Sequence, residues 1–134
     1  MVGFLLITHG ALGEALLRAA GHTLGRPLER AEHISVSAAD APESMLARAR
    51  EAIARIDDGS GVLVIADMYG ATPANVAAKL LANGRVEGLA GANLPMLVRA
   101  LAHRDSPLRE VLEKARAGGV EGVVYMNADR CRHG

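Results

Sequence analysis

The feature that most constrains this sequence is its alternation of short apolar runs with segments of helical periodicity. Residues 2–7 and 62–66 are continuous apolar runs, and residues 33–36 and 87–90 are weaker ones. Apolar residues recur at the spacing of one helix face in four segments: residues 12–19, 46–56, 76–81 and 108–115. Strands that are apolar throughout are typical of a parallel sheet covered by helices on both faces. The sequence therefore predicts a three-layer α/β/α fold with a mostly parallel central sheet.

Proline and glycine residues indicate where the helices begin and where the last one ends. Four prolines suit the first turn of a helix, where the missing N–H is not needed: Pro42, Pro73, Pro95 and Pro107. The pair Gly118–Gly119 is expected to end the last helix and to act as a hinge. The apolar segment Val120–Met126 then predicts one more strand, antiparallel and at the edge of the sheet.

Composition narrows the classes of function. The 134 residues suit a single domain, in which residues 130–134 form a tail that matches no pattern. The 15 basic and 15 acidic side chains give a formal net charge of zero, and the aromatic residues are one Phe and two Tyr. Neither a basic surface nor a stacking platform is implied, which argues against nucleic acid as a partner.

The N-terminal run and the single cysteine bear on cellular location and on metal binding. The run stops at Thr8 and no basic segment precedes it, so we expect neither a signal peptide nor insertion into a membrane. The lone Cys131 excludes an internal disulfide and suits a cytoplasmic protein. Because Cys131 and His133 are only two ligands, we expect no metal and no other cofactor.

Two residues that directly follow apolar runs are the best candidates for chemistry. His9 follows the first run, and Asp67 follows the run at residues 62–66. Ligands of open α/β sheets bind beyond the carboxyl ends of the strands, and neighbouring strands lie about 4.8 Å apart. If these two strands are neighbours, the Asp67 carboxylate can hydrogen-bond to the His9 ring. It would fix the imidazole tautomer and leave the other ring nitrogen as a nucleophile.

The segment after Asp67 also predicts a site for an anion. Gly70 and Ala71 allow a tight turn, and Thr72 then begins a helix whose first N–H groups have no partner within the helix. These donors and the helix dipole suit the oxygens of a phosphoryl group. We expect the Thr72 hydroxyl either to cap the helix or to bond the phosphoryl group.

Three segments stand out by their order and spacing. They are residues 7–17 (Ile-Thr-His-Gly-Ala-Leu-Gly-Glu-Ala-Leu-Leu), 66–75 (Ala-Asp-Met-Tyr-Gly-Ala-Thr-Pro-Ala-Asn) and 91–97 (Gly-Ala-Asn-Leu-Pro-Met-Leu). Together they resemble the mannose-family enzyme IIA domain of the bacterial phosphoenolpyruvate-dependent sugar phosphotransferase system. The resemblance covers roughly residues 1–126.

The resemblance implies a phosphotransferase that is phosphorylated on His9, with Asp67 paired to the imidazole. It also implies strand order 2-1-3-4 and a last strand exchanged between the subunits of a homodimer. The donor would be the histidine phosphocarrier HPr. The acceptor would be a IIB component, which we expect on a separate chain because these 134 residues include no IIB domain. The role would lie in sugar uptake or in its regulation.

The sequence departs from the usual family pattern around Asp67, where the family reads Asp-Leu-Phe-Gly-Gly-Ser-Pro. Tyr69 and Thr72 keep a ring and a hydroxyl at their positions. Ala71 replaces a glycine and would be strained if the backbone there were left-handed. A partner protein also needs apolar contacts near His9, and four residues are candidates to supply them: Met68, Tyr69, Leu94 and Met96.

Other functions remain open from the residues alone. In a receiver-like signalling module Asp67 would be the phosphoacceptor, but such modules need acidic residues after the first strand, where Thr8 and His9 stand. A nucleotide-binding enzyme would carry G-x-x-x-x-G-K-[ST] or G-x-G-x-x-G, and neither occurs. A phosphotransfer protein of the dihydroxyacetone kinase system is closer, although residues 67–75 and 91–97 fit the mannose type better.

Overall fold

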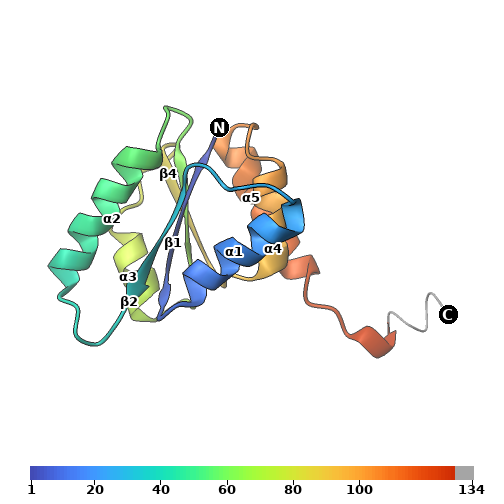
Figure 1. Ribbon diagram of the computed structural model, residues 1–134, viewed down its shortest axis with the longest axis horizontal. Coiled ribbons are helices and arrows are strands. Elements are labelled where there is room, and N and C mark those ends of the chain that lie inside the picture. Colours follow the sequence, from blue (N-terminus) through green and yellow to red (C-terminus); the bar gives the residue numbers. More distant parts are fainter. Residues whose placement is uncertain (129–134) are drawn as a thin grey trace.

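The computed structural model describes residues 1–128, in which strands and helices alternate (Figure 1). The strands are β1 (Gly3–His9), β2 (Ala31–Val36), β3 (Val62–Ala66) and β4 (Val86–Ala90). The helices are α1 (Leu12–Leu24), α2 (Pro42–Ile56), α3 (Thr72–Ala78), α4 (Leu94–Ala102) and α5 (Leu108–Glu121). The four apolar runs at residues 2–7, 33–36, 62–66 and 87–90 each form part of a strand, as predicted.

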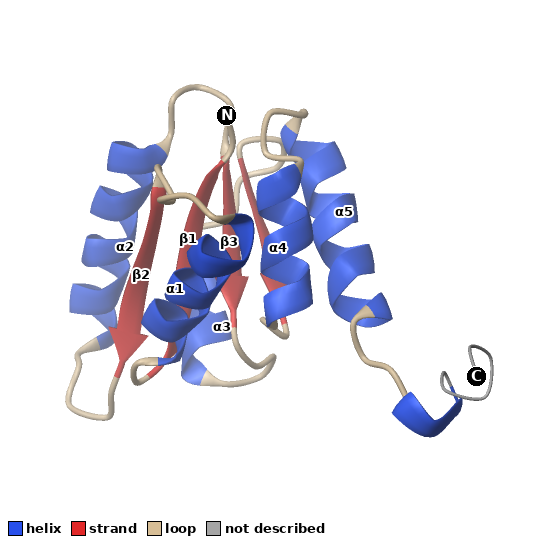
Figure 2. Cartoon of the chain, turned by 45° about the vertical axis from the view of Figure 1, so that its right-hand side comes forward, coloured by secondary structure: helices blue, strands red, loops and turns tan. Residues whose placement is uncertain are grey.

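The strands form one parallel sheet in the order β2-β1-β3-β4. Their arrowheads point to the same edge of the sheet (Figure 2). Helices α2 and α3 cover one face, and α1, α4 and α5 cover the other (Figure 1). The predicted α/β/α fold and strand order are therefore confirmed. The chain passes from β1 outward to β2 and then returns to β3, so the strand order reverses between β1 and β3.

Alternate residues of β1 face the two helical layers, because side chains of a strand point to opposite faces. Leu5 and Ile7 pack in the core beneath α2 and α3, whereas Phe4 and Leu6 pack beneath α1, α4 and α5. By the same alternation Thr8 belongs to the α1 face and His9 to the α3 face. The central strand is thus apolar on both sides and ends in two polar residues directed to opposite layers.

The amino ends of β1 and β2 are tied together by Arg104, a residue that is 7% exposed. Its Nε and Nη2 donate to the Val2 carbonyl at 3.2 and 2.8 Å, and Nη2 also donates to the Arg30 carbonyl at 3.2 Å. The guanidinium carbon lies 5.2 Å from the centroid of the Phe4 ring. Burial lowers the pKa of Arg104 from its ordinary value. The side chain therefore links the start of β1 to the loop before β2.

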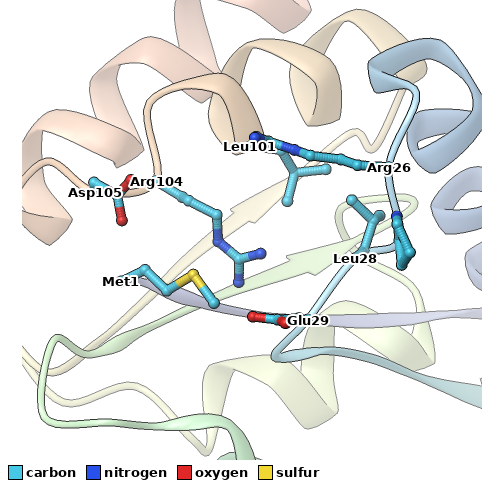
Figure 3. A pocket seen from close by; sticks show the side chains of 8 residues that line it. Met1, Arg26, Leu28, Glu29, Leu101, Arg104 and Asp105 are labelled. Atoms are coloured by element: carbon cyan, nitrogen blue, oxygen red, sulfur yellow. The ribbon is translucent and has the colours of Figure 1, made fainter.

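A hollow of about 360 Å³ lies beside Arg104 (Figure 3). The loop at residues 26–29 and the side chain of Leu101 line it, and the guanidinium points into it. The buried charged group in its lining, the Arg104 guanidinium, already donates to backbone carbonyls. The hollow is therefore a feature of the packing at the amino ends of the strands. Among residues 1–128, no helix has both the length and the apolar character needed to cross a membrane.

The predicted edge strand over Val120–Met126 is wrong for residues 120, 121 and 126, which are helical, and is not formed by the residues between them. Helix α5 continues to Glu121, residues 123–125 have no regular structure, and residues 126–128 form a short helical turn. In Figure 2 this segment leads away from the sheet. Its apolar side chains are exposed: Val123, Val124, Tyr125 and Met126. Residues 130–134, including Cys131 and His133, lie outside the described part of the chain.

Gly118 and Gly119 explain why the helix was expected to end too early. A Cβ on Gly118 would lie 2.9 Å from Cβ of Arg99, and one on Gly119 would lie 2.8 Å from Cε of Met96. Both glycines are buried inside α5, where they allow that helix to pack closely against α4. They serve packing between helices and do not form a hinge.

Candidate functional site

The carboxyl ends of β1 and β3 bring His9 and Asp67 together. Ile7 is paired with Ala66 in the sheet, so His9 and Asp67 extend just beyond that pair. The His9 Nδ1 atom lies 2.9 Å from Asp67 Oδ2, and the His9 backbone N–H donates to the same oxygen at 3.0 Å. The hydrogen-bond distance predicted from the sequence is confirmed.

The two side chains differ sharply in exposure. The His9 ring is 52% exposed, whereas the Asp67 side chain is only 9% exposed. Burial alone would raise the pKa of Asp67, but the backbone N–H and the ring of His9 outweigh burial and lower that pKa below its usual value. Asp67 is therefore an ionised acceptor near neutral pH. Since a carboxylate cannot donate, Nδ1 carries the proton of this hydrogen bond, and in the neutral ring Nε2 is then the nitrogen with the lone pair.

The loop after β3 makes the tight turn that its sequence predicts, and its backbone decides two questions that the sequence left open. Gly70 has φ of 84°, a left-handed conformation that glycine adopts without strain. Ala71 is extended, with φ of −103° and ψ of 172°, so replacing the usual glycine there causes no strain. Thr72 is the first residue of α3 and does not cap it, since the N-cap position is Ala71.

The apolar residues proposed as partner contacts divide into two groups. Met68 is 57% exposed and Tyr69 is 89% exposed, so both are accessible next to Asp67. Leu94 is partly buried at the start of α4. Met96 was the wrong choice, because it is 5% exposed and packs in the core against Gly119. Two residues further along the helix, it faces α5 and is covered by it.

Three further residues of this region have roles that the sequence patterns did not predict. Leu12 opens α1 and is 43% exposed, which adds an apolar side chain three residues after His9. Asn93 caps α4 by accepting from the Met96 N–H at 2.9 Å and donates to the Gly119 carbonyl at 3.1 Å. Its position before Leu-Pro was a signal for an N-cap. Thr8 is fully buried and hydrogen-bonds to α1.

The described residues place no set of metal ligands at this site. Within residues 1–128, no three His, Cys, Asp or Glu side chains are placed to hold an ion together. The possible pair Cys131 and His133 lies beyond the residues that the structure describes. The groups that the structure brings together at this edge of the sheet are the His9 ring and the Asp67 carboxylate.

Comparison with known proteins by sequence finds a family model and a curated relative that match most of this chain. The family model EIIA-man, described as "PTS system fructose IIA component", matches residues 3–116. The "PTS system mannose-specific EIIAB component" of Escherichia coli K12 is 31% identical over 130 residues, which are 95% of this chain and 40% of that protein. The chain thus spans less than half the length of this curated relative.

Two solved structures share the fold over most of their length. A phosphotransferase system component EIIA from Streptococcus agalactiae superposes with a TM-score of 0.84 at 22% identity, covering 96% of this chain and 99% of the other. A mannose/sorbose specific IIA subunit from Enterococcus faecalis gives a TM-score of 0.80 at 25% identity, covering 92% of each chain.

Proposed function

Because this chain belongs to the EIIA-man family of phosphotransferase-system IIA components, we propose that it carries a phosphoryl group on Nε2 of His9. One observation supports this most directly. The bond from Nδ1 to Asp67 at 2.9 Å leaves Nε2 as the free nitrogen of a ring that is 52% exposed. The nucleophile is thus accessible at the carboxyl edge of the sheet, between the two strands where the order reverses.

Phosphoryl transfer to His9 needs no change in the proton on Nδ1. The lone pair of Nε2 attacks phosphorus of the donor's phosphohistidine, an Nε2–P bond forms, and the donor's N–P bond breaks with its electron pair returning to the donor ring. The positive charge that develops on the His9 ring is balanced by the Asp67 carboxylate, which stays ionised. The second step is the reverse in kind, as the acceptor's nucleophile attacks phosphorus and Nε2 leaves.

The turn after β3 supplies donors for the phosphoryl oxygens in this proposal. Gly70, Ala71 and Thr72 belong to it, and the first N–H groups of α3 have no acceptor within that helix. Pro73 removes one of these donors. The exposed Thr72 hydroxyl is not used as a cap and is therefore available to a phosphoryl oxygen.

The partners are proposed from the same family. HPr would be the donor and a IIB component the acceptor, in sugar uptake or in its regulation, in the cytoplasm. Met68, Tyr69 and Leu12 offer exposed apolar side chains close in sequence to Asp67 and His9. The partly buried Leu94 follows shortly after the end of β4. Such contacts would let a partner exclude water while the phosphoryl group moves.

A homodimer is proposed from two exposed surfaces of this chain. Strand β4 lies at the edge of the sheet, and an apolar groove of about 150 Å³ runs beside it between Leu81 and Leu89. The exposed segment 123–126 of a second copy is an occupant of matching character. Sedimentation at micromolar concentration should give twice the 14.0 kDa chain mass. Removal of residues 123–134 should give the monomer, and an unchanged mass would contradict the exchange.

The receiver-like alternative finds no support. Asp67 is nearly buried and its Oδ2 is occupied by His9, which suits a positioning role better than attack on phosphorus. The matching family and the two solved structures described above are IIA components.

The test is phosphorylation by phosphoenolpyruvate, enzyme I and HPr, followed by mapping of the modified residue. We expect an acid-labile, base-stable phosphate on His9 and none in His9→Ala. His103→Ala is the matched control, since His103 is also exposed and its Nδ1 also has an oxygen partner, the Arg99 carbonyl at 2.9 Å. A base-labile phosphate on Asp67, or label on His103, would refute the proposal.

A further inference from the structure

Thr8 is a polar residue in the most apolar part of the molecule. It is 0% exposed at the end of β1, on the face where Phe4 and Leu6 pack against the helices. A valine would fill this position at the same size, and a buried hydroxyl is costly without a hydrogen-bond partner. The hydroxyl therefore needs an explanation.

Its partner is the first turn of α1. The Gly13 N–H donates to Thr8 Oγ1 at 2.7 Å. Gly13 is the second residue of α1, and the N-cap residue, Ala11, has no side chain that could accept from it. Thr8 thus replaces a missing N-cap from outside the helix, satisfying a donor that would otherwise be buried and unpaired.

The contact depends on Gly13 as much as on Thr8. A Cβ at position 13 would lie 2.9 Å from Thr8 Oγ1, 3.3 Å from the Cβ of His33 and 3.4 Å from the Cβ of Leu6. Glycine therefore allows the helix to approach the sheet closely enough for the hydrogen bond to form.

This hydrogen bond closes the short loop that carries His9. Only residues 9–12 separate its two ends, and Gly10 within it has φ of 51°. His9 must aim both its backbone N–H and its Nδ1 at one oxygen of Asp67. A ring that is half exposed has few other contacts to hold it, so the direction of the backbone at residue 9 decides whether both bonds form.

We propose that Thr8 is a positioning residue for phosphoryl transfer: by capping α1 at Gly13, its hydroxyl fixes the loop that directs His9 at Asp67. This role rests on the proposed function of His9. Thr8 touches neither the phosphoryl group nor the His9 ring. It acts through the orientation of the residue that follows it, and misplacement of a reacting group by about 1 Å can cost up to about 10²-fold in rate.

The experiment compares Thr8→Val, which keeps the shape and removes the acceptor, with Thr8→Ser, which keeps the acceptor. The control is Thr23→Val on the same helix, where the hydroxyl donates to the Ala19 carbonyl at 2.9 Å and is exposed. Three readouts are needed: the rate of transfer from phospho-HPr, the ¹⁵N signals of the His9 ring, and the melting temperature.

For Thr8→Val we expect about a tenfold fall in kcat with little change in KM for phospho-HPr, and a His9 ring that loses its fixed Nδ1–H tautomer. Thr8→Ser should restore both, and Thr23→Val should change neither. Wild-type ring signals and rate in folded Thr8→Val would overturn the proposal. If Thr8→Val does not fold, Gly13→Ala decides, because it strains the same contact while keeping the hydroxyl, and wild-type behaviour there would also overturn it.

The ring signals separate this proposal from the function on which it rests. They report the tautomer in the unphosphorylated protein. If the wild type takes no phosphate on His9, the proposed function fails, while the ¹⁵N signals still test whether Thr8 fixes the ring.

Discussion

The two ends of β1 hold a nitrogen-containing side chain in opposite ways. At the amino end Arg104 is 7% exposed as a residue, and its guanidinium donates to two backbone carbonyls. At the carboxyl end, about 20 Å away along the strand, the His9 ring is 52% exposed and shares one carboxylate oxygen with its own backbone N–H. The Arg104 donors bond to groups inside the fold, whereas the ring of His9 has one nitrogen bonded to Asp67 and the other available on an exposed ring.

The difference separates stability from function along one strand. Backbone carbonyls do not change their protonation state with pH. A buried guanidinium that donates to two of them therefore holds two chain segments together at any ordinary pH. A carboxylate partner supplies charge, which is what an imidazole needs when it becomes cationic during transfer. We therefore expect substitution of Arg104 to change the free energy of unfolding and substitution of Asp67 to change the rate of transfer.

Arg104→Met should have the largest effect on stability. Its loss leaves the Val2 and Arg30 carbonyls without their side-chain donor and removes the contact with Phe4. We expect the free energy of unfolding to fall by about 3 kcal/mol, measured by urea denaturation, with phosphorylation of the folded protein unchanged. Arg48→Met, an exposed arginine of α2, is the control and should cost less than about 0.5 kcal/mol. Equal stability of the two variants would remove the contrast between the ends.

Asp67→Asn should have the opposite profile. The amide oxygen can still accept from the His9 backbone N–H and from Nδ1, since one oxygen accepts both in the native site. The variant then keeps much of the geometry and loses the charge that balances the phosphorylated ring. We expect transfer to slow by on the order of 10²-fold, the low end for such residues, with a melting temperature close to wild type. An unchanged transfer rate in rapid-quench measurements would reduce Asp67 to a turn residue.

The sequence predicted the geometry of the carboxyl end better than that of the amino end. The apolar runs predict the strands, and His9 and Asp67 directly follow two of them. Their contact then follows once β1 and β3 are neighbours in the sheet. Arg104 could not be placed in this way, because its partners Val2 and Arg30 are 102 and 74 residues away in sequence. The contact between Thr8 and Gly13 is local, yet its signal was only a threonine in an aliphatic strand.

The errors of the sequence analysis have a common physical cause. Met96 is apolar near the start of a helix, and periodicity alone does not say that α5 covers it. Gly118 and Gly119 suit a helix end in isolation, but close packing against α4 keeps them helical. In each case a contact between α4 and α5 overrode a local preference, and that contact is not encoded in either segment by itself.

The smallest expected effect is on the amide signals of the amino end when His9 is phosphorylated. The modification adds about −1.5 to −2 charges at one exposed point. The amino end lies about 20 Å away. This is about two and a half Debye lengths at physiological ionic strength, where the Debye length is about 8 Å. Between them β1 is buried on both faces, and a packed strand does not deform continuously.

Amide chemical shifts measured before and after phosphorylation give the test. We expect changes at residues 8–12 and 67–76, with smaller ones at residues 91–96, and none at Phe4, Arg30 or Arg104. His9→Ala in the same phosphorylation mixture is the control, and its spectrum should not change. Shifts that extend through α2 or reach Arg104 would mean that the two ends are coupled through the sheet. The strand would then transmit a conformational change, and the division between a stabilising end and a reactive end would not hold.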